Sequence, residues 1–82
     1  MHKYLIFGIH VGDRENNSGK VQSVLTEFGC NIKTRLGIHE TDSCMPNAVI
    51  LVQFKPDDVV ADEFQRRLEG IPTVQVKKMV FD

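Results

Sequence analysis

A short polar segment carries the residue types of a small-molecule site. Its residues are Gly12, Asp13, Arg14, Glu15 and Asn16. Glycine lets a ligand approach the backbone closely, and the free N–H groups at the start of a helix attract an anion or a carboxylate. We therefore predict an effector site at these five residues. The alternative is that they only form a turn and a cap, which any helix starting here needs.

A second candidate site contains the donor atoms that transition metals prefer. The donors are His10, Cys30, His39, Glu40, Asp42 and Cys44. Histidine and cysteine together suit Zn, Ni or Cu, and the short spacing from His39 to Cys44 would let both reach one ion. We predict His39, Glu40 and Cys44 as the metal ligands. The spacing is not that of a zinc finger, so the alternative is structural, with Cys30 a small buried hydrophobe and Cys44 an incidental loop thiol.

The glycine-containing segment also bears on catalysis. Residues 8–14, GIHVGDR, weakly resemble the phosphate-cradling loop of acylphosphatases. That loop places Val and Phe between its glycine and arginine, whereas here only Asp13 separates Gly12 from Arg14. We find no Ser-His-Asp arrangement, paired-carboxylate motif or Walker loop. We therefore predict that the protein is not an enzyme, with an acylphosphatase-like hydrolase as a lesser alternative.

Length and composition predict one small globular domain. The chain has 82 residues, 41% of them hydrophobic and 26% charged, which allows one core spanning residues 1–82. The net charge of −1 and the scattered positive charges argue against nucleic-acid binding. No apolar run is long enough for a membrane span, and no secretory cleavage site follows the first run. We expect a cytoplasmic protein with reduced cysteines.

The hydrophobic pattern predicts six elements in the order βαββαβ. Residues 3–11 and 48–54 are almost wholly apolar, which is typical of central strands. Alternation over residues 31–38 and 73–81 predicts two further strands with one polar face each. Apolar residues at helical spacing predict a helix that begins near residues 15–18 and ends at about Phe28, and a second that opens at Pro56-Asp57-Asp58 and stops before Gly70.

These elements predict an α+β, ferredoxin-like βαββαβ sandwich. Its antiparallel sheet has the strand order 4-1-3-2, with two helices on one face. The first strand has apolar residues on both faces, with Leu5, Phe7 and Ile9 on one and Tyr4 and Ile6 on the other. Since two helices cover only one face, we predict a homo-oligomer, a dimer or tetramer, formed through the open sheet face or the strand edges.

Three segments resemble a known family. They are residues 32–40 (IKTRLGIHE), residues 44–47 (CMPN) and residues 74–81 (VQVKKMVF). Together with Glu15-Asn16 and Lys20-Val21-Gln22, they are similar to the iron-only hydrogenase system regulators. That family resembles ACT domains and the C-terminal domain of the nickel-responsive repressor. The resemblance implies a regulatory oligomer that binds an amino-acid-like effector or a metal at a subunit interface.

The predicted function is therefore that of a small sensor module linked to iron-only hydrogenase maturation. By the ACT pattern, the effector contacts are Gly12 and the residues that follow it. By the family's own motif, His39, Glu40 and Cys44 are the positions to test, and a metal-binding or metal-delivery protein is the alternative function. The expected partners are a second copy, the effector, and another regulatory or maturation protein, with no membrane partner.

Overall fold

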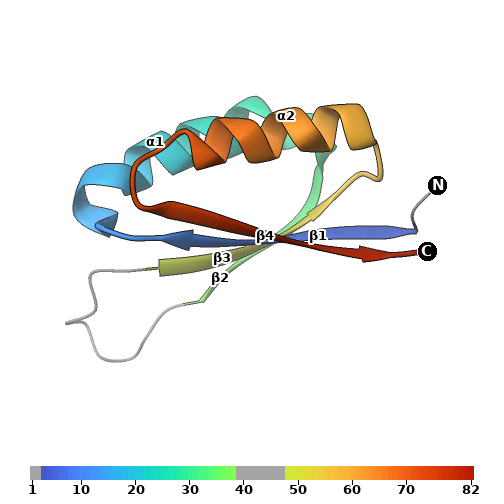
Figure 1. Ribbon diagram of the computed structural model, residues 1–82, viewed down its shortest axis with the longest axis horizontal. Coiled ribbons are helices and arrows are strands. Elements are labelled where there is room, and N and C mark those ends of the chain that lie inside the picture. Colours follow the sequence, from blue (N-terminus) through green and yellow to red (C-terminus); the bar gives the residue numbers. More distant parts are fainter. Residues whose placement is uncertain (1–2, 39–47) are drawn as a thin grey trace.

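The computed structural model describes residues 3–38 and 48–82. The elements follow the predicted βαββαβ order, with one short 3-10 turn, η1, added after the first helix (Figure 1). They are β1 (Tyr4–Val11), α1 (Arg14–Glu27), η1 (Gly29–Asn31), β2 (Ile32–Ile38), β3 (Ala48–Phe54), α2 (Asp58–Glu69) and β4 (Val74–Phe81).

The four strands form one antiparallel sheet in the order β2-β3-β1-β4, which is the predicted order 4-1-3-2 read from the other edge. Both helices lie on the same face of this sheet (Figure 1). The ferredoxin-like, ACT-like fold class predicted from the sequence is therefore confirmed. The two apolar strands, β1 and β3, are central because only they are flanked by strands on both sides.

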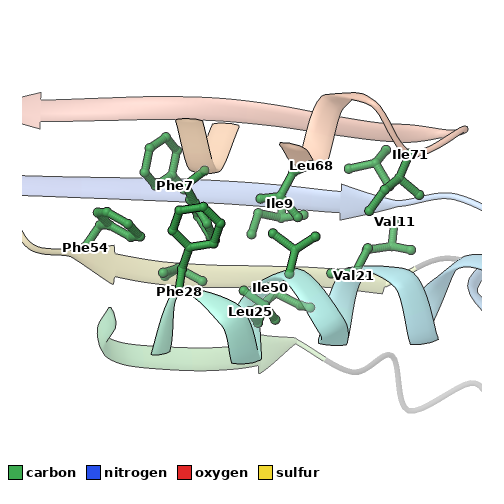
Figure 2. Packing of buried hydrophobic residues seen from close by; sticks show 14 of the residues in the cluster. Phe7, Ile9, Val11, Val21, Leu25, Phe28, Ile50, Phe54, Leu68 and Ile71 are labelled. Atoms are coloured by element: carbon green, nitrogen blue, oxygen red, sulfur yellow. The ribbon is translucent and has the colours of Figure 1, made fainter. Parts of the chain in front are cut away.

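The core lies between the helices and the sheet. In β1, Leu5, Phe7 and Ile9 are completely buried, and they pair across the sheet with Phe54, Val52 and Ile50 of β3. Alternate residues of a strand point to opposite faces, so this register places both buried sets on the helix side. Figure 2 shows the side chains of the two strands meeting those of α1 and α2.

Four aromatic rings fill one end of this core. Phe64 of α2 stacks on Phe54 with ring centroids 4.7 Å apart. It also meets the edges of Phe7 and Phe28, at 5.2 and 5.3 Å. Offset and edge-to-face contacts of this kind stabilise a core beyond the area that they bury. Phe64 therefore joins α2 to β1, β3 and the end of α1.

The helix boundaries differ slightly from the predicted ones. Helix α1 begins at Arg14, just before the predicted start, because Asp13 serves as its N-cap with a left-handed φ of 49°. Gly29 follows the helix as predicted, but it is the first residue of η1. It does not adopt the left-handed conformation of a C-terminal cap, since no glycine of the described segments has a positive φ. Helix α2 starts as predicted, and the Asp57 carboxylate accepts a hydrogen bond from the Val60 N–H at 3.2 Å.

Strand β2 is an edge strand, as predicted, but its two faces are used in an unexpected way. A register shift between Ile32 and Thr34 interrupts the alternation. Beyond it, Leu36 and Ile38 lie on the open face, 57% and 45% exposed, while Arg35 and Gly37 pair with buried residues of β3 on the helix side. The bulge therefore turns the polar side of β2 toward α1.

No helix of the described segments is long and apolar enough to cross a membrane.

Candidate functional site

The first predicted effector residue, Gly12, is held by the connection between α2 and β4. Its N–H donates to the Thr73 carbonyl at 3.0 Å, and its own carbonyl accepts from the Thr73 hydroxyl at 2.5 Å. The buried Asn17 amide donates to the Gly12 carbonyl at 3.3 Å and to the Thr73 hydroxyl at 2.9 Å. Thr73 has a left-handed φ of 66°, which is rare for a β-branched residue. The hydrogen-bonding groups of Gly12 are thus directed at the protein itself.

The next residues of the turn have different surroundings. Asp13 accepts hydrogen bonds from the Asn16 side chain at 2.9 and 3.1 Å, so these two side chains are paired with each other. Glu15 is exposed in the first turn of α1. Arg14 differs from all of these because it lines a pocket. The structure therefore gives the five residues distinct positions, and effector binding by them stays a prediction.

The pocket lies between the N-terminal half of α1 and the adjoining ends of β1, β2 and β3. Its volume is about 290 Å³. The residues that line it are Val11, Arg14, Ser18, Val21, Gln22, Arg35, Gly37, Ile38, Ala48, Val49 and Ile50. Three of these residues, Val11, Val21 and Ile50, are buried core residues (Figure 2), and we call them the floor of the pocket. Arg14, Gln22 and Arg35 are exposed and form its rim.

Two sequence patterns create this pocket. Arg14, Ser18 and Gln22 repeat every four residues and so form one polar row along α1, beside the apolar row that enters the core. Opposite them, Arg35 and Gly37 occupy the helix side of β2. Gly37 of β2 and Ala48 of β3 are small, so they leave space between α1 and the sheet. Ser18, Gln22 and Arg35 were not predicted from the sequence, although the four-residue spacing of the polar row was a usable signal.

The pocket rim is positively charged. Arg35 donates a hydrogen bond to the Gln22 side-chain carbonyl at 2.6 Å. The Arg14 side chain makes no ion pair or hydrogen bond with the other described residues. By contrast, the two arginines of α2 both face carboxylates, Arg66 with Glu63 and Arg67 with Glu27. The hydrogen bond to Glu27 and its negative charge raise the pKa of Arg67 above its ordinary value.

The predicted metal ligands His39, Glu40 and Cys44 lie outside the described residues. Within the described part of the chain, no group of three or more His, Cys, Asp or Glu side chains is placed to hold an ion. His10 pairs with Val49 at the start of β3. Cys30 is in η1, next to Asn31, whose carbonyl accepts a hydrogen bond from the Lys55 N–H. Lys55 follows the C-terminal end of β3, whereas Val49 lies at its N-terminal end. The structure therefore does not bring His10 and Cys30 together.

The structural interpretation of Cys30 as a buried hydrophobe is wrong. Its thiol is free and the residue is exposed. The reason is that helix α1 ends at Glu27 and the apolar stripe ends at Phe28, so the following 3-10 turn lies at the surface rather than over the core. Asn17, not a cysteine, is the polar residue buried in the described structure.

Comparisons with known proteins identify the fold. No protein family model matches the chain, and no curated protein sequence matches it. Among solved structures, the uncharacterized protein TM1266 from Thermotoga maritima is 26% identical over the full length of both chains, with a TM-score of 0.87. A formyltetrahydrofolate deformylase from Pseudomonas putida KT2440 is 17% identical, with a TM-score of 0.58.

That second match covers 94% of this chain but only 28% of the deformylase. At this identity it shows a shared fold and nothing about activity. The full-length match to TM1266 shows that the whole chain, and not only its sheet, has a counterpart of known structure. Fold and comparisons together show that the chain has a ferredoxin-like, ACT-like fold.

Proposed function

We propose that this protein is a non-catalytic regulatory module that binds a small-molecule effector and acts as a homo-oligomer. The observation that carries the proposal is the pocket beside the predicted effector segment, with Arg14 common to both. Pockets with an apolar floor and a few polar groups at the rim are typical of small-molecule sites. The ACT-like fold supports the same conclusion, because it is a fold of regulatory domains.

The composition of the pocket supports binding rather than catalysis. Its described lining contains no His, Cys, Asp, Glu or Lys, and Ser18 supplies the one hydroxyl among those residues. Hydrolases that use general-base catalysis place the base within hydrogen-bond reach of the attacking group. None of the described lining residues supplies one at neutral pH, since an arginine stays protonated.

The open face of the sheet supports self-association. Tyr4, Met79 and Phe81 are each about half exposed. Their register shows that they share the open face, since Tyr4 pairs with Phe81 and Met79 pairs with Ile6. Leu36 and Ile38 are exposed on the same face at the other edge. A contiguous apolar surface is unusual on a soluble monomer. We propose that a second copy covers it.

The process that the module regulates is proposed from the sequence resemblance to the iron-only hydrogenase system regulators. The segments 32–38 and 74–81, which carry much of that resemblance, form the two edge strands. Deleting the gene in its host and measuring the maturation of iron-only hydrogenase tests this part. Unchanged maturation would contradict the link to hydrogenase while leaving effector binding intact.

Effector binding is tested with a panel of amino acids, 2-oxo acids, short-chain carboxylates and divalent metal ions. Thermal unfolding identifies the compounds that bind, because a ligand selective for the folded state raises Tm. Sedimentation equilibrium then compares the oligomer with and without each such compound. We expect at least one compound to change the association constant about fivefold or more, as coupled sites do.

Two results would contradict the proposal. One is a panel in which nothing raises Tm. The other is hydrolysis of a small acyl phosphate that is lost on replacing Arg14 with Gln, which would establish the acylphosphatase alternative. The same assay with Arg66→Gln, an exposed arginine on α2, controls for the change of charge.

A further inference from the structure

We propose that the pocket between α1, β2 and β3 selects a net anion: a small carboxylate with a branched apolar body and no ammonium group. This inference rests on the proposed function and specifies the ligand of the same site. Three properties of the pocket carry it, namely its charge, its floor and its size.

The charge of the pocket is uncompensated by any described residue. Arg14 and Arg35 both line it, and the described lining contains no acidic side chain. The neutral Gln22 amide is the hydrogen-bond partner of Arg35. The other two arginines of the chain, Arg66 and Arg67, each face a glutamate instead. Guanidinium groups match carboxylates in charge and in planar geometry, so an anion supplies the negative charge that no described residue places beside Arg14 and Arg35.

The same charge pattern discriminates against an amino acid. A zwitterion brings an ammonium group as well as a carboxylate, and an ammonium group needs acceptors, best of all an acidic side chain. The described lining contains no acidic side chain to accept from the ammonium group. It would also place that group near the two guanidinium groups of Arg14 and Arg35. A carboxylate without the amine avoids this repulsion.

The floor sets the shape of the rest of the ligand. Val11, Val21 and Ile50 come from three different elements, β1, α1 and β3 (Figure 2), and all three line the pocket. The apolar lining that is still accessible belongs to Ile38, Ala48 and Val49. A purely inorganic anion would leave this surface unused, whereas a branched hydrocarbon group buries it. The volume of about 290 Å³ lies at the lower end of the range for small-molecule pockets, which fits a short acid.

Gln22 acts as a positioning residue. Its side-chain carbonyl holds the Arg35 guanidinium at 2.6 Å, which fixes the direction of the remaining N–H groups before the ligand arrives. Preorganised donors bind more tightly because less side-chain freedom is lost on binding. Gln22→Leu should weaken carboxylate binding less than the loss of either arginine does. Gln22→Glu should weaken binding more than Gln22→Leu, since a carboxylate at position 22 competes with the ligand for Arg35.

The experiment compares four probes by isothermal titration calorimetry on the full chain. They are 4-methylpentanoate, its amide, leucine and acetate. We expect 4-methylpentanoate to bind at least tenfold more tightly than each of the other three. Arg14→Gln and Arg35→Gln should each weaken that binding about tenfold or more, the effect of losing a charged hydrogen bond. Arg66→Gln, with the same loss of charge on α2, should leave it unchanged.

A space-filling variant separates the pocket from surface charge. Ser18→Leu keeps both arginines but occupies part of the pocket, so it should abolish binding while circular dichroism shows a folded protein. Several results would overturn the inference: equal binding of the acid and its amide, tighter binding of leucine, no binding of 4-methylpentanoate, or binding that survives loss of both arginines. None of these contradicts the proposed function if another compound of the broader panel raises Tm.

Discussion

Gly12 and Thr73 pack so closely that a side chain on Gly12 has no room. A Cβ built there would lie 3.0 Å from both the Cβ and the carbonyl oxygen of Thr73. The carbonyl oxygen belongs to the backbone and is fixed by its own hydrogen bond to Gly12. The glycine of the predicted effector segment therefore has a packing role that joins two turns, whatever else binds near it.

We expect Gly12→Ala to lower the free energy of unfolding by about 1–3 kcal/mol, because overpacking forces the backbone to move. Gly19→Ala is the matched control. Gly19 lies in the interior of α1, and a methyl group added there would meet no atom within 4 Å, so alanine should raise stability by about 0.5–1 kcal/mol. Urea unfolding of both variants measures the difference, and a neutral Gly12→Ala would contradict the packing argument.

Asn17 is the buried polar residue of this turn, with 5% of its surface exposed. Its amide bridges the Gly12 carbonyl and the Thr73 hydroxyl. Asn17→Ala should cost about 1–3 kcal/mol, the usual effect of leaving buried polar groups without a partner. Ser23→Ala, which removes an exposed hydrogen bond to the Gly19 carbonyl, should change stability by less than about 0.5 kcal/mol. Equal effects of the two substitutions in urea unfolding would show that the bridge contributes nothing specific.

Helix α2 is attached to the sheet mainly through the residues of one face. Ala61, Phe64 and Leu68 follow the helical repeat and are buried, whereas Val59 is 80% exposed. Its ion pair with α1, between Arg67 and Glu27, is exposed on both sides, and exposed pairs of this kind contribute little. The attachment of α2 therefore depends on apolar packing.

Phe64→Ala should lower the free energy of unfolding by about 3–5 kcal/mol, because it removes the ring that contacts Phe7, Phe28 and Phe54. Val59→Ala, also an apolar truncation on α2, should change it by less than about 0.5 kcal/mol. Chemical denaturation monitored by circular dichroism measures both. A small loss for Phe64→Ala would mean that α2 is held by contacts other than the aromatic cluster.

At the scale of the whole molecule, the two faces of the sheet have opposite roles. The helix side holds the core and the pocket. The open side carries apolar side chains toward both edges of the sheet, with Gly8 of β1 between them. The proposed ligand site and the proposed interface share β2, since Arg35 and Leu36 are neighbours on opposite faces of this strand. Under the proposed function, this arrangement gives a physical route for coupling the effector to the oligomer.

We expect Leu36→Lys and Met79→Lys each to weaken self-association at least tenfold, because a charge would be buried at the interface without a partner. Both side chains are more than half exposed in the protomer, so the fold should survive. Val59→Lys, on the helix side, should leave association unchanged. Sedimentation equilibrium measures all three, and a wild-type protein that stays monomeric at micromolar concentration would contradict the interface.

Much of the fold was predictable from the sequence because its signals are local. The unbroken apolar runs of β1 and β3 predicted central strands, and the repeat of Val21, Val24 and Leu25 predicted the buried face of α1. The candidate site was predictable only in part. Arg14 was among the predicted effector residues, but Ser18, Gln22 and Arg35 were not, since they are distributed over two elements whose approach no local pattern reveals.

The sequence by itself determined the order of the elements, the identity of the central strands and the existence of an apolar sheet face without a helix to cover it. These follow from the hydrophobic period and from the number of helices available. Only the tertiary structure decided that the bulge after Ile32 turns Arg35 toward α1, that Thr73 occupies the hydrogen bonds of Gly12, and that a pocket remains where Gly37 and Ala48 are small. The physical reason is that register and close packing depend on contacts between distant segments, which no local pattern encodes.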